Sequence, residues 1–292
     1  MSAAAPWLQA ARPKTLPAGA APVVMGTAMA AAAGGLHVPA ALCALVGALL
    51  IQIGTNYAND YYDFIKGTDT EARVGPTRAT AAGLVTPAQM RIAMVLVLAL
   101  ALLPGAYLIY RGGWPILAVG LLSLVFAVGY TGGPFPLAYL GLGDVFVLFF
   151  FGPVAVGGTY YVQTLTLPPE VLVAGLAPGL ISTAILTVNN LRDLEGDRTA
   201  GKNTLAVRFG AAFARMEYLG SLLLACLAIP LALAVWRAEH WPVVLAAITL
   251  LPALPVVRTV FTQHGAPLNK ALAGTGKLVV IFAVLFSIGW LL

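Results

Sequence analysis

The sequence predicts an all-α fold: a polytopic membrane helical bundle of nine transmembrane helices, forming a single domain over residues 1–292. Its composition is 60% hydrophobic and only 9% charged, with a mean hydropathy of +0.91. A soluble domain carries about 25% charged residues. Apolar runs of about 17 residues or more recur along the chain, and runs of that length can cross a bilayer. These observations exclude an ordinary soluble fold.

The apolar runs define the expected transmembrane helices. We expect them at residues 17–36, 40–58, 90–110, 114–130, 144–162, 171–190, 214–235, 242–261 and 273–291. The run at 242–261 fits least well because Pro252 and Pro255 interrupt it. Membrane helices tolerate proline where neighbouring helices satisfy the freed carbonyls. The first run follows Arg12 and Lys14 as a signal peptide would, but its prolines favour a retained span.

The basic residues predict the orientation in the membrane. If the N-terminus is cytoplasmic, all sixteen Lys and Arg residues except Arg111 and Arg237 fall on the cytoplasmic side. Cytoplasmic loops of membrane proteins carry an excess of Lys and Arg. We therefore expect a multi-pass protein of the cell inner (cytoplasmic) membrane, with cytoplasmic motif loops near 59–89 and 189–213. The net charge of +5 reflects this topology and an anionic ligand, and not nucleic acid.

The first polar motif follows an uncharged apolar run, 40–55. It contains Asn56, Asn59, Asp60 and Asp63, at relative positions 0, +3, +4 and +7. On a helix of 3.6 residues per turn these four side chains share one face. Carboxylates at the end of so apolar a helix are costly to keep, and this cost indicates function.

A long polar loop, 66–87, follows the first motif. It mixes both charge signs in Lys66, Asp69, Arg73 and Arg78, and its glycines interrupt any long helix. A polar loop at a membrane face is ordinarily only solvated. Because this loop begins at the acidic motif, we interpret it as a cap that brings Arg73 and Arg78 over the site.

A second polar motif lies about 130 residues further on. It consists of Asn189, Asn190, Arg192, Asp193 and Asp197, and Lys202 follows five residues later. The step of four residues from Asn to Asp occurs in both motifs. The orientation places the two motifs on the same side of the membrane, so they can face one cavity.

The residue types of the two motifs favour magnesium and a diphosphate. Magnesium prefers carboxylate oxygen and usually bridges one or two carboxylates to substrate phosphates. Neighbouring Lys and Arg side chains would neutralise the phosphates. Histidine and cysteine are absent from both motifs, which argues against zinc, copper or iron. A diphosphate at the mouth of an apolar bundle implies a lipid tail below it. The alternative for each aspartate is a structural ion pair with a nearby arginine.

Two further segments have open interpretations. The loop 130–143 carries no charge, so it either dips into the bilayer as part of an acyl tunnel or forms a tight Gly- and Pro-rich turn. Asp144 opens the next helix, where it either caps the helix or faces the cavity, and we favour the cap. The aromatic residues of 145–161 either pack the bundle or surround a cationic intermediate.

The motifs resemble those of the UbiA-type intramembrane prenyltransferases, which have nine helices and two aspartate-rich motifs. The similar segments are residues 12–19, 59–70, 75–87, 130–144, 150–163 and 189–210. The resemblance implies magnesium bound through Asp60, Asp63, Asp193 and Asp197. It also implies diphosphate contacts from Lys66, Arg78 and Lys202, and acceptor contacts from Arg12.

Within the family, the chain is most similar to the branch that acts in menaquinone synthesis. The resemblance implies transfer of a polyprenyl group from polyprenyl diphosphate to 1,4-dihydroxy-2-naphthoate, with loss of CO2 and diphosphate, to give demethylmenaquinol. Two positions depart from the wider family. Gly67 stands where the first motif commonly has a third Asp, and Tyr130 begins a Tyr-x-x-x-Lys motif that ends here in Pro134. The missing Lys makes a benzoate acceptor less favourable.

Two alternative functions are carried forward, and a third is disfavoured. One is transfer to another quinone precursor, such as homogentisate. Another, from a different class, is a cation-coupled transporter, although transporters place polar groups near mid-membrane in broken helices. A phospholipid-type phosphotransferase is disfavoured because its Asp-Gly-x-x-Ala-Arg signature is missing from both acidic motifs.

Overall fold

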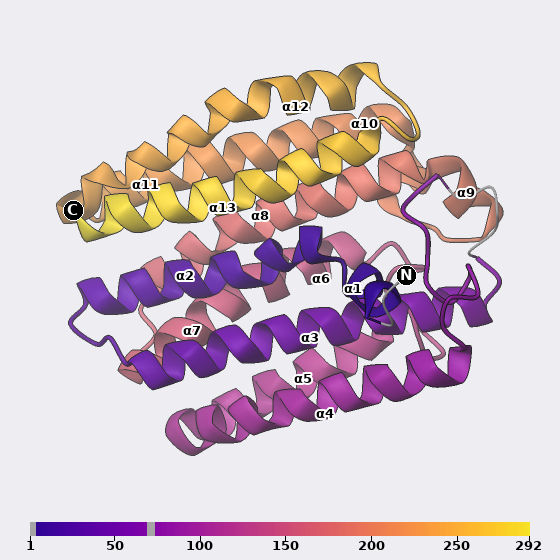
Figure 1. Ribbon diagram of the computed structural model, residues 1–292. Helices are drawn as coiled ribbons and strands as arrows, with labels where there is room; N and C mark the ends of the chain where they lie inside the picture. The colour runs from indigo at the N-terminus through magenta and orange to yellow at the C-terminus, as the bar shows by residue number, and fades with distance from the viewer. Residues whose placement is uncertain (1–3, 69–73) are drawn as a thin grey trace.

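The computed structural model describes residues 4–68 and 74–292 (Figure 1). Within these ranges all regular secondary structure is helical. Eight helical segments are long and apolar enough to cross a membrane, and the shorter apolar helix α5 (Trp114–Gly129) is a ninth. The predicted nine-helix membrane bundle is therefore confirmed for the described part of the chain.

The first span is divided into three pieces. They are α1 (Ala5–Ala11), a 3-10 turn η1 (Pro13–Thr15) and α2 (Leu16–Ala32). The break falls at Arg12, whose φ of 51° is left-handed. Pro13 follows, and the residue before a proline is disfavoured in the α-helical region. The predicted helix at 17–36 is α2, and α1 is an additional element that the apolar pattern did not indicate.

The second span, α3 (Val38–Ile65), extends seven residues past the predicted end at 58. The whole polar motif therefore forms the last turns of this helix. Gly67 adopts a positive φ of 68° just after the helix end, a conformation that glycine adopts without strain. The next helix, α4 (Pro87–Gly112), begins with a capping box between Thr86 and Gln89.

A π-helical turn interrupts the span that follows α5. This span consists of α6 (Gly143–Phe149), the π-turn η2 (Phe150–Val154) and α7 (Ala155–Thr164). Pro153 lies inside the turn and cannot donate a helical hydrogen bond. The expected helix 144–162 is thus present but bent at its centre.

The remaining elements complete the bundle. They are α8 (Pro169–Arg192), α9 (Leu194–Thr199), α10 (Leu205–Leu223), the π-turn η3 (Leu224–Ala228), α11 (Ile229–Trp236), the 3-10 segment η4 (Ala238–Thr249), α12 (Leu250–Thr262) and α13 (Leu268–Leu291). The segment α10 begins at Leu205, where the hydroxyl of Thr204 accepts a hydrogen bond from the Val207 amide at 3.2 Å, and its backbone kinks at Gly210 (φ 84°), close to the predicted start at 214. The segment with the interrupting prolines starts as 3-10 rather than α-helix.

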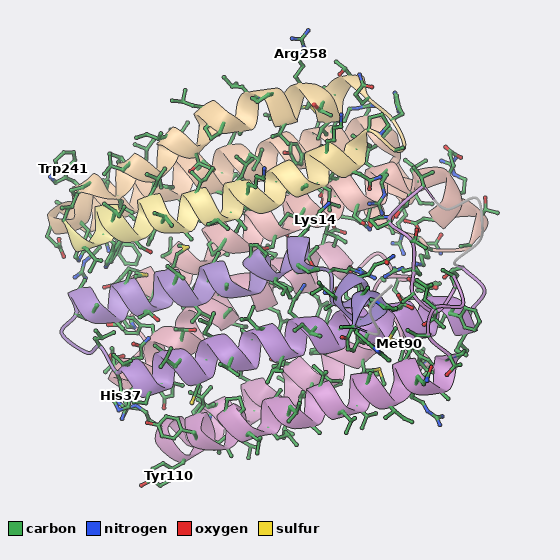
Figure 2. All side chains as sticks on the ribbon, in the orientation of Figure 1. Lys14, His37, Met90, Tyr110, Trp241 and Arg258 are labelled. Atoms are coloured by element: carbon green, nitrogen blue, oxygen red, sulfur yellow. The ribbon has the colours of Figure 1, made fainter. Side chains whose placement is uncertain are left out.

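Both polar motifs lie at one end of the bundle. Helix α9 and the chain that follows α3 are at the right in Figure 1, and α1 is close to them. Figure 2 shows His37 at the start of α3, Tyr110 near the end of α4 and Trp241 in η4, all at the opposite end. Helix α8 packs against α10, α13 and α6. Helix α13 also packs against α2, so it joins the last part of the chain to the first.

Glycines allow α8 to approach the bent span at backbone distance. A Cβ atom on Gly179 would lie 2.3 Å from the carbonyl oxygen of Leu148, and one on Gly175 would lie 2.7 Å from the Cα atom of Pro153. Small residues at helix contacts are typical of membrane proteins because they let backbones approach closely. This contact fixes the position of α6, one wall of the site described below.

We predict that Gly179→Ala destabilises the bundle. The added methyl group would overlap the Leu148 carbonyl, and overpacking typically costs about 1–3 kcal/mol. The unfolding temperature in detergent should fall by roughly 3–10 °C. Gly220→Ala on α10 is the matched control, since a Cβ there meets nothing within 4 Å. Equal unfolding temperatures for the two variants would contradict the close contact.

Candidate active site

One large cavity begins between the two motifs and continues into the apolar interior. Its volume is about 890 Å³. Along α3 it extends from Asp63 to Ala44, roughly 29 Å of helix at about 1.5 Å per residue. That length is close to the thickness of the hydrocarbon core, about 30 Å. The cavity therefore has a polar end near the membrane face and a long apolar end.

Most of the residues predicted for the site line this cavity. They are Arg12, Asn56, Asn59, Asp60, Asp63, Arg78, Tyr130, Asn189, Asn190, Arg192, Asp193, Asp197 and Lys202. Lys66 does not line the cavity, but its ammonium group donates a hydrogen bond to the carbonyl of Thr131, which does. Asp69 and Arg73 lie outside the described residues, so their predicted contacts remain predictions.

Asp60 binds the backbone of the loop that follows α3. Its two carboxylate oxygens accept hydrogen bonds from the amides of Ala79 and Thr80, each at 3.0 Å. The Asp60 side chain is almost completely buried. Hydrogen bonds to an ionised carboxylate are about twice as strong as neutral ones. In this structure Asp60 thus anchors the loop, a role that the sequence alone did not suggest.

Asp63 joins the two motifs directly. It forms ion pairs with Arg78 of the loop and with Lys202, which follows the second motif, both at 3.0 Å. Its side chain is only 3% exposed, so both pairs are shielded from water. The hydroxyls of Thr68 and Tyr139 also donate to it, at 3.3 Å each. Segments 139 residues apart in sequence therefore meet at one carboxylate.

The uncharged segment 130–142 bridges the two motifs. The Lys66 ammonium donates to the Thr131 carbonyl at 2.6 Å, and the Thr131 hydroxyl donates to the side chain of Asn59. On the other side, the Asn203 amide donates to the Tyr139 carbonyl at 3.1 Å. The segment is therefore more than a tight turn, since its backbone carbonyls hold residues of both motifs.

Tyr139 is a site residue that the sequence analysis missed. Its ring lies 4.2 Å from the Lys66 ammonium and 5.1 Å from that of Lys202. Cations over an aromatic face gain stabilisation of about 0.5–2 kcal/mol. Burial lowers the pKa of Lys66, and the nearby Asp63 charge opposes this effect. Two ammonium groups are thus gathered on one ring beside the acidic motif; only the aromatic character of the segment could have signalled this.

The guanidinium group of Arg192 holds the second motif in place through several hydrogen bonds. Arg192 donates to both carboxylate oxygens of Asp193, to Asn189 at 2.8 Å and to Asn269 of α13 at 2.9 Å. This network orients the end of α8 against the start of α13. Asp197, one turn further along α9, lines the cavity.

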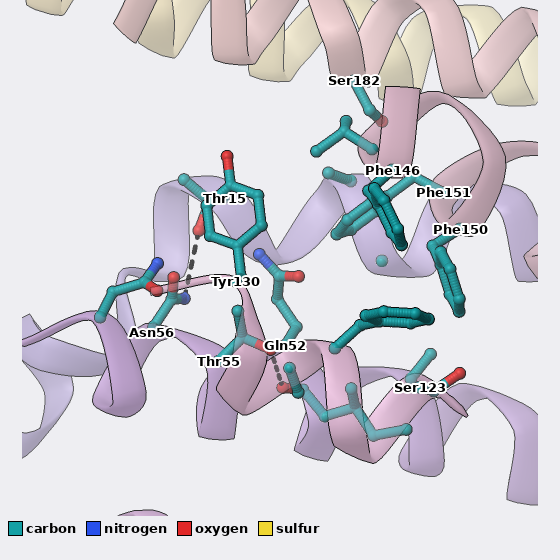
Figure 3. A pocket seen from close by; sticks show the side chains of 18 of the residues that line it. Thr15, Gln52, Thr55, Asn56, Ser123, Tyr130, Phe146, Phe150, Phe151 and Ser182 are labelled. Atoms are coloured by element: carbon teal, nitrogen blue, oxygen red, sulfur yellow. Dashed lines mark hydrogen bonds between the residues drawn. The ribbon is translucent and has the colours of Figure 1, made fainter. Parts of the chain in front are cut away.

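The polar end also includes the break in the first span. The Asn56 side-chain amide donates to the Ala11 carbonyl at 2.9 Å and to the Thr15 hydroxyl at 3.4 Å. These bonds hold both sides of the left-handed residue Arg12, which lines the cavity. Figure 3 shows the contact between Asn56 and Thr15, with Gln52 and Tyr130 close by.

An aromatic wall faces these polar groups across the pocket (Figure 3). The ring centroids of Phe126 and Phe146 are 4.5 Å apart, and those of Phe126 and Phe150 are 5.3 Å apart. Phe151 also lines the cavity, whereas Phe149 points outward and is half-exposed. Aromatic faces near a cavity can stabilise a positive charge.

Tyr130 lies among acidic groups of three elements. Burial raises the pKa of its hydroxyl, and the charges of Asp144, Asp197 and Asp63 raise it further. Tyr130 therefore keeps its proton at neutral pH and can donate a hydrogen bond to a ligand in the cavity.

The cap interpretation of Asp144 is wrong. The N-cap of α6 is Leu142, and no side chain caps it. Asp144 lies in the first turn, where it is buried and lines the cavity. The reason is that α6 begins at Gly143, so Asp144 is already inside the first turn and is not at the cap position.

The four aspartates do not form a ready-made metal cage. Among residues 4–68 and 74–292, no group of three or more His, Cys, Asp or Glu side chains is close enough to hold an ion. Magnesium commonly uses one or two carboxylates together with substrate phosphates. The donor set, all carboxylate and amide oxygen, fits an ion shared with a diphosphate better than a permanently bound one.

Comparison with known proteins agrees with this architecture. The model of the UbiA prenyltransferase family matches residues 20–281. A 1,4-dihydroxy-2-naphthoate octaprenyltransferase of Haemophilus influenzae is 37% identical over 98% of this chain and 96% of its own. One of Mycobacterium tuberculosis is 42% identical over 97% and 96%.

A solved structure has the same fold at low sequence identity. It is a UbiA homolog from Archaeoglobus fulgidus bound to GPP and Mg2+, which is 16% identical over 98% of this chain and 99% of its own, with a TM-score of 0.65. The chain therefore belongs to the UbiA prenyltransferase family and is a transferase enzyme of the membrane.

Proposed function

We propose that this enzyme transfers a polyprenyl group from polyprenyl diphosphate to 1,4-dihydroxy-2-naphthoate, releasing CO2 and diphosphate and giving demethylmenaquinol. The observation that carries the proposal is the cavity that begins between the two motifs. Cationic side chains from both motifs converge at its polar end, and an apolar passage of bilayer length leads away from them. A polyprenyl diphosphate fits this cavity, because its anionic head matches the cationic end and its long hydrocarbon tail matches the apolar passage.

The diphosphate is bound by the cations around Asp63. Arg78 and Lys202 already meet at this carboxylate, and Lys66 is held over the same tyrosine ring as Lys202. Asp60, Asp63, Asp193 and Asp197 would hold magnesium together with the phosphates, and the ion would supply positive charge to the leaving diphosphate. The solved relative bound to GPP and Mg2+ supports this assignment.

The reacting carbon lies where polar and aromatic walls meet. When the allylic C–O bond breaks, the electron pair leaves with the diphosphate and the prenyl carbon becomes cationic. Phe126, Phe146 and Phe150 stabilise that cation and exclude water. Arg12 attracts the carboxylate of the acceptor to the same end of the cavity.

The acceptor assignment comes from the relatives. Both relatives described above are named for transfer to 1,4-dihydroxy-2-naphthoate and are 37–42% identical across nearly the whole chain. If the enzyme instead acts on homogentisate, a mixture of homogentisate and 1,4-dihydroxy-2-naphthoate should yield prenylated homogentisate as the product. A cation-coupled transporter is disfavoured because the acidic groups lie at one end of the bundle (Figure 1). We further infer that this end faces the cytoplasm in the inner membrane, from the distribution of Lys and Arg.

We predict that Asp193→Ala abolishes prenyl transfer. Loss of one group that stabilises developing charge typically lowers kcat by about 100-fold or more. Product formation from dihydroxynaphthoate, a prenyl diphosphate and Mg2+ is the measurement. Glu195→Ala in the same motif is the matched control, because its side chain is 80% exposed. Full activity of Asp193→Ala at saturating Mg2+ would refute the metal assignment.

Lys202→Gln should weaken binding of the prenyl diphosphate. Hydrogen bonds to charged groups contribute about 1.5–3 kcal/mol, so KM for this substrate should rise roughly 10- to 100-fold. Arg198→Gln is the control, since Arg198 is half-exposed and pairs with Glu195. An unchanged KM in the Lys202 variant would show that the diphosphate binds elsewhere.

Gly120→Phe should shorten the prenyl chain that the enzyme accepts. Gly120 lines the apolar part of the cavity, and a Cβ there meets nothing within 4 Å. The new ring would fill the passage, so kcat/KM should fall about tenfold or more for long chains and stay near normal for short ones. Leu122→Phe, on the exposed face of the same helix, is the control. A uniform loss over all chain lengths would argue against a tail passage.

A further inference from the structure

Asp144 is a buried carboxylate in the cavity that the two motifs do not account for. It is 5% exposed and lines the cavity at the start of α6. Its Oδ1 atom has no hydrogen-bond partner in the described part of the chain. No ion pair of the described residues includes it, although ion pairs hold Asp63 and Asp193 nearby. The carboxylate accepts a hydrogen bond from its own backbone amide. A buried oxygen without a partner is nevertheless costly, so the retention of Asp144 indicates a ligand that supplies a proton donor to Oδ1.

The surroundings of Asp144 match a hydroxylated aromatic ring. Ser182 of α8 also lines the cavity, is 4% exposed, and its hydroxyl has no partner among the described residues. The Tyr130 hydroxyl lies against Gly143, the neighbour of Asp144, since a Cβ there would be 2.9 Å from it. Phe146 and Phe150 form the adjoining apolar wall. Polar groups at one edge and aromatic faces beside them suit a planar phenol.

The proposed reaction needs a proton acceptor at this place. Carbon–carbon bond formation at the carboxyl-bearing ring carbon is helped if the adjacent hydroxyl loses its proton, because its electrons then move into the ring. None of the aspartates of the two motifs suits this task. Asp60 and Asp63 already accept hydrogen bonds from the loop and its cations, and all four are assigned to the metal and diphosphate.

We propose that Asp144 is the catalytic base on the acceptor side, binding the hydroxyl next to the carboxyl-bearing carbon; this inference rests on the proposed function. As the new carbon–carbon bond forms, the hydroxyl proton moves to Asp144 and the oxygen becomes a ketone. The carboxylate then leaves as CO2. The electron pair of its broken bond restores the aromatic ring, and the oxygen takes the proton back from Asp144. Asp144 returns the proton that it accepted, so protons and electrons balance without a further reactant.

The test compares two acceptors in two forms of the enzyme. One acceptor is 1,4-dihydroxy-2-naphthoate, and the other is its 1-methyl ether, which has no proton to give. In Asp144→Asn, kcat for the dihydroxy acceptor should fall about 100-fold, the usual range for general bases. The slow reaction of the ether should change less than about threefold, because the base has no role in it.

Two controls separate catalysis from folding. Glu170→Gln on α8 removes another buried carboxyl, one that pairs with Arg237 and does not line the cavity, and should leave both rates unchanged. Magnesium-dependent binding of an unreactive geranyl thiodiphosphate should be the same in Asp144→Asn as in the unsubstituted enzyme. If the Asn variant does not fold, Asp144→Glu and the acceptor comparison on the unsubstituted enzyme replace it.

The outcomes distinguish this inference from the function on which it rests. Equal slowing of both acceptors in the Asn variant, no slowing at all, or equal kcat for both acceptors in the unsubstituted enzyme would overturn the role of Asp144 alone. Absence of any prenylated naphthol from the unsubstituted enzyme would overturn the proposed function and this inference together.

Discussion

The architecture depends on one buried carboxylate. Asp63, at the end of α3, holds Arg78 from the loop that follows it and Lys202 from beyond the second motif. Burying three charges is costly unless each is paired and hydrogen-bonded, and removing one partner from such a group typically costs about 3–5 kcal/mol. The hydroxyls of Thr68 and Tyr139 complete the shell of Asp63. This cluster closes the polar end of the cavity and gathers there the positive charge that a diphosphate requires.

The segment 130–142 makes that cluster possible. It carries no charge, yet its Thr131 and Tyr139 carbonyls accept hydrogen bonds from Lys66 and from the amide of Asn203. The Tyr139 ring lies beneath two ammonium groups. An uncharged bridge can hold cations from both motifs without neutralising them. Asp63 pairs with Arg78 and Lys202, and because the bridge adds no further carboxylate, the polar end keeps an excess of positive charge for an anionic ligand.

The apolar end of the cavity follows from helix packing. Glycines let α8 touch the bent span formed by α6 and α7 at backbone distance, and both α8 and this span line the cavity. Because the bilayer is as apolar as the helix surfaces, large residues face lipid without penalty. The interior can then stay hollow, lined by small residues of α3, α4 and α5 such as Gly47, Gly105 and Gly120.

The membrane bundle, its spans and the two polar helix ends could be predicted from the sequence, because hydropathy and the 3.6-residue period are local properties. The sequence also identified Asp60, Asp63, Asp193 and Asp197 as a set, since intramembrane carboxylates are rare. Three contacts became visible only in the folded chain. Asp60 binds loop amides, the Tyr139 ring lies under the ammonium groups of two lysines, and Asp144 lines the cavity. The contacts of Asp60 and Tyr139 join residues 19 to 73 positions apart, and no local pattern in a sequence records which distant segment a side chain will meet.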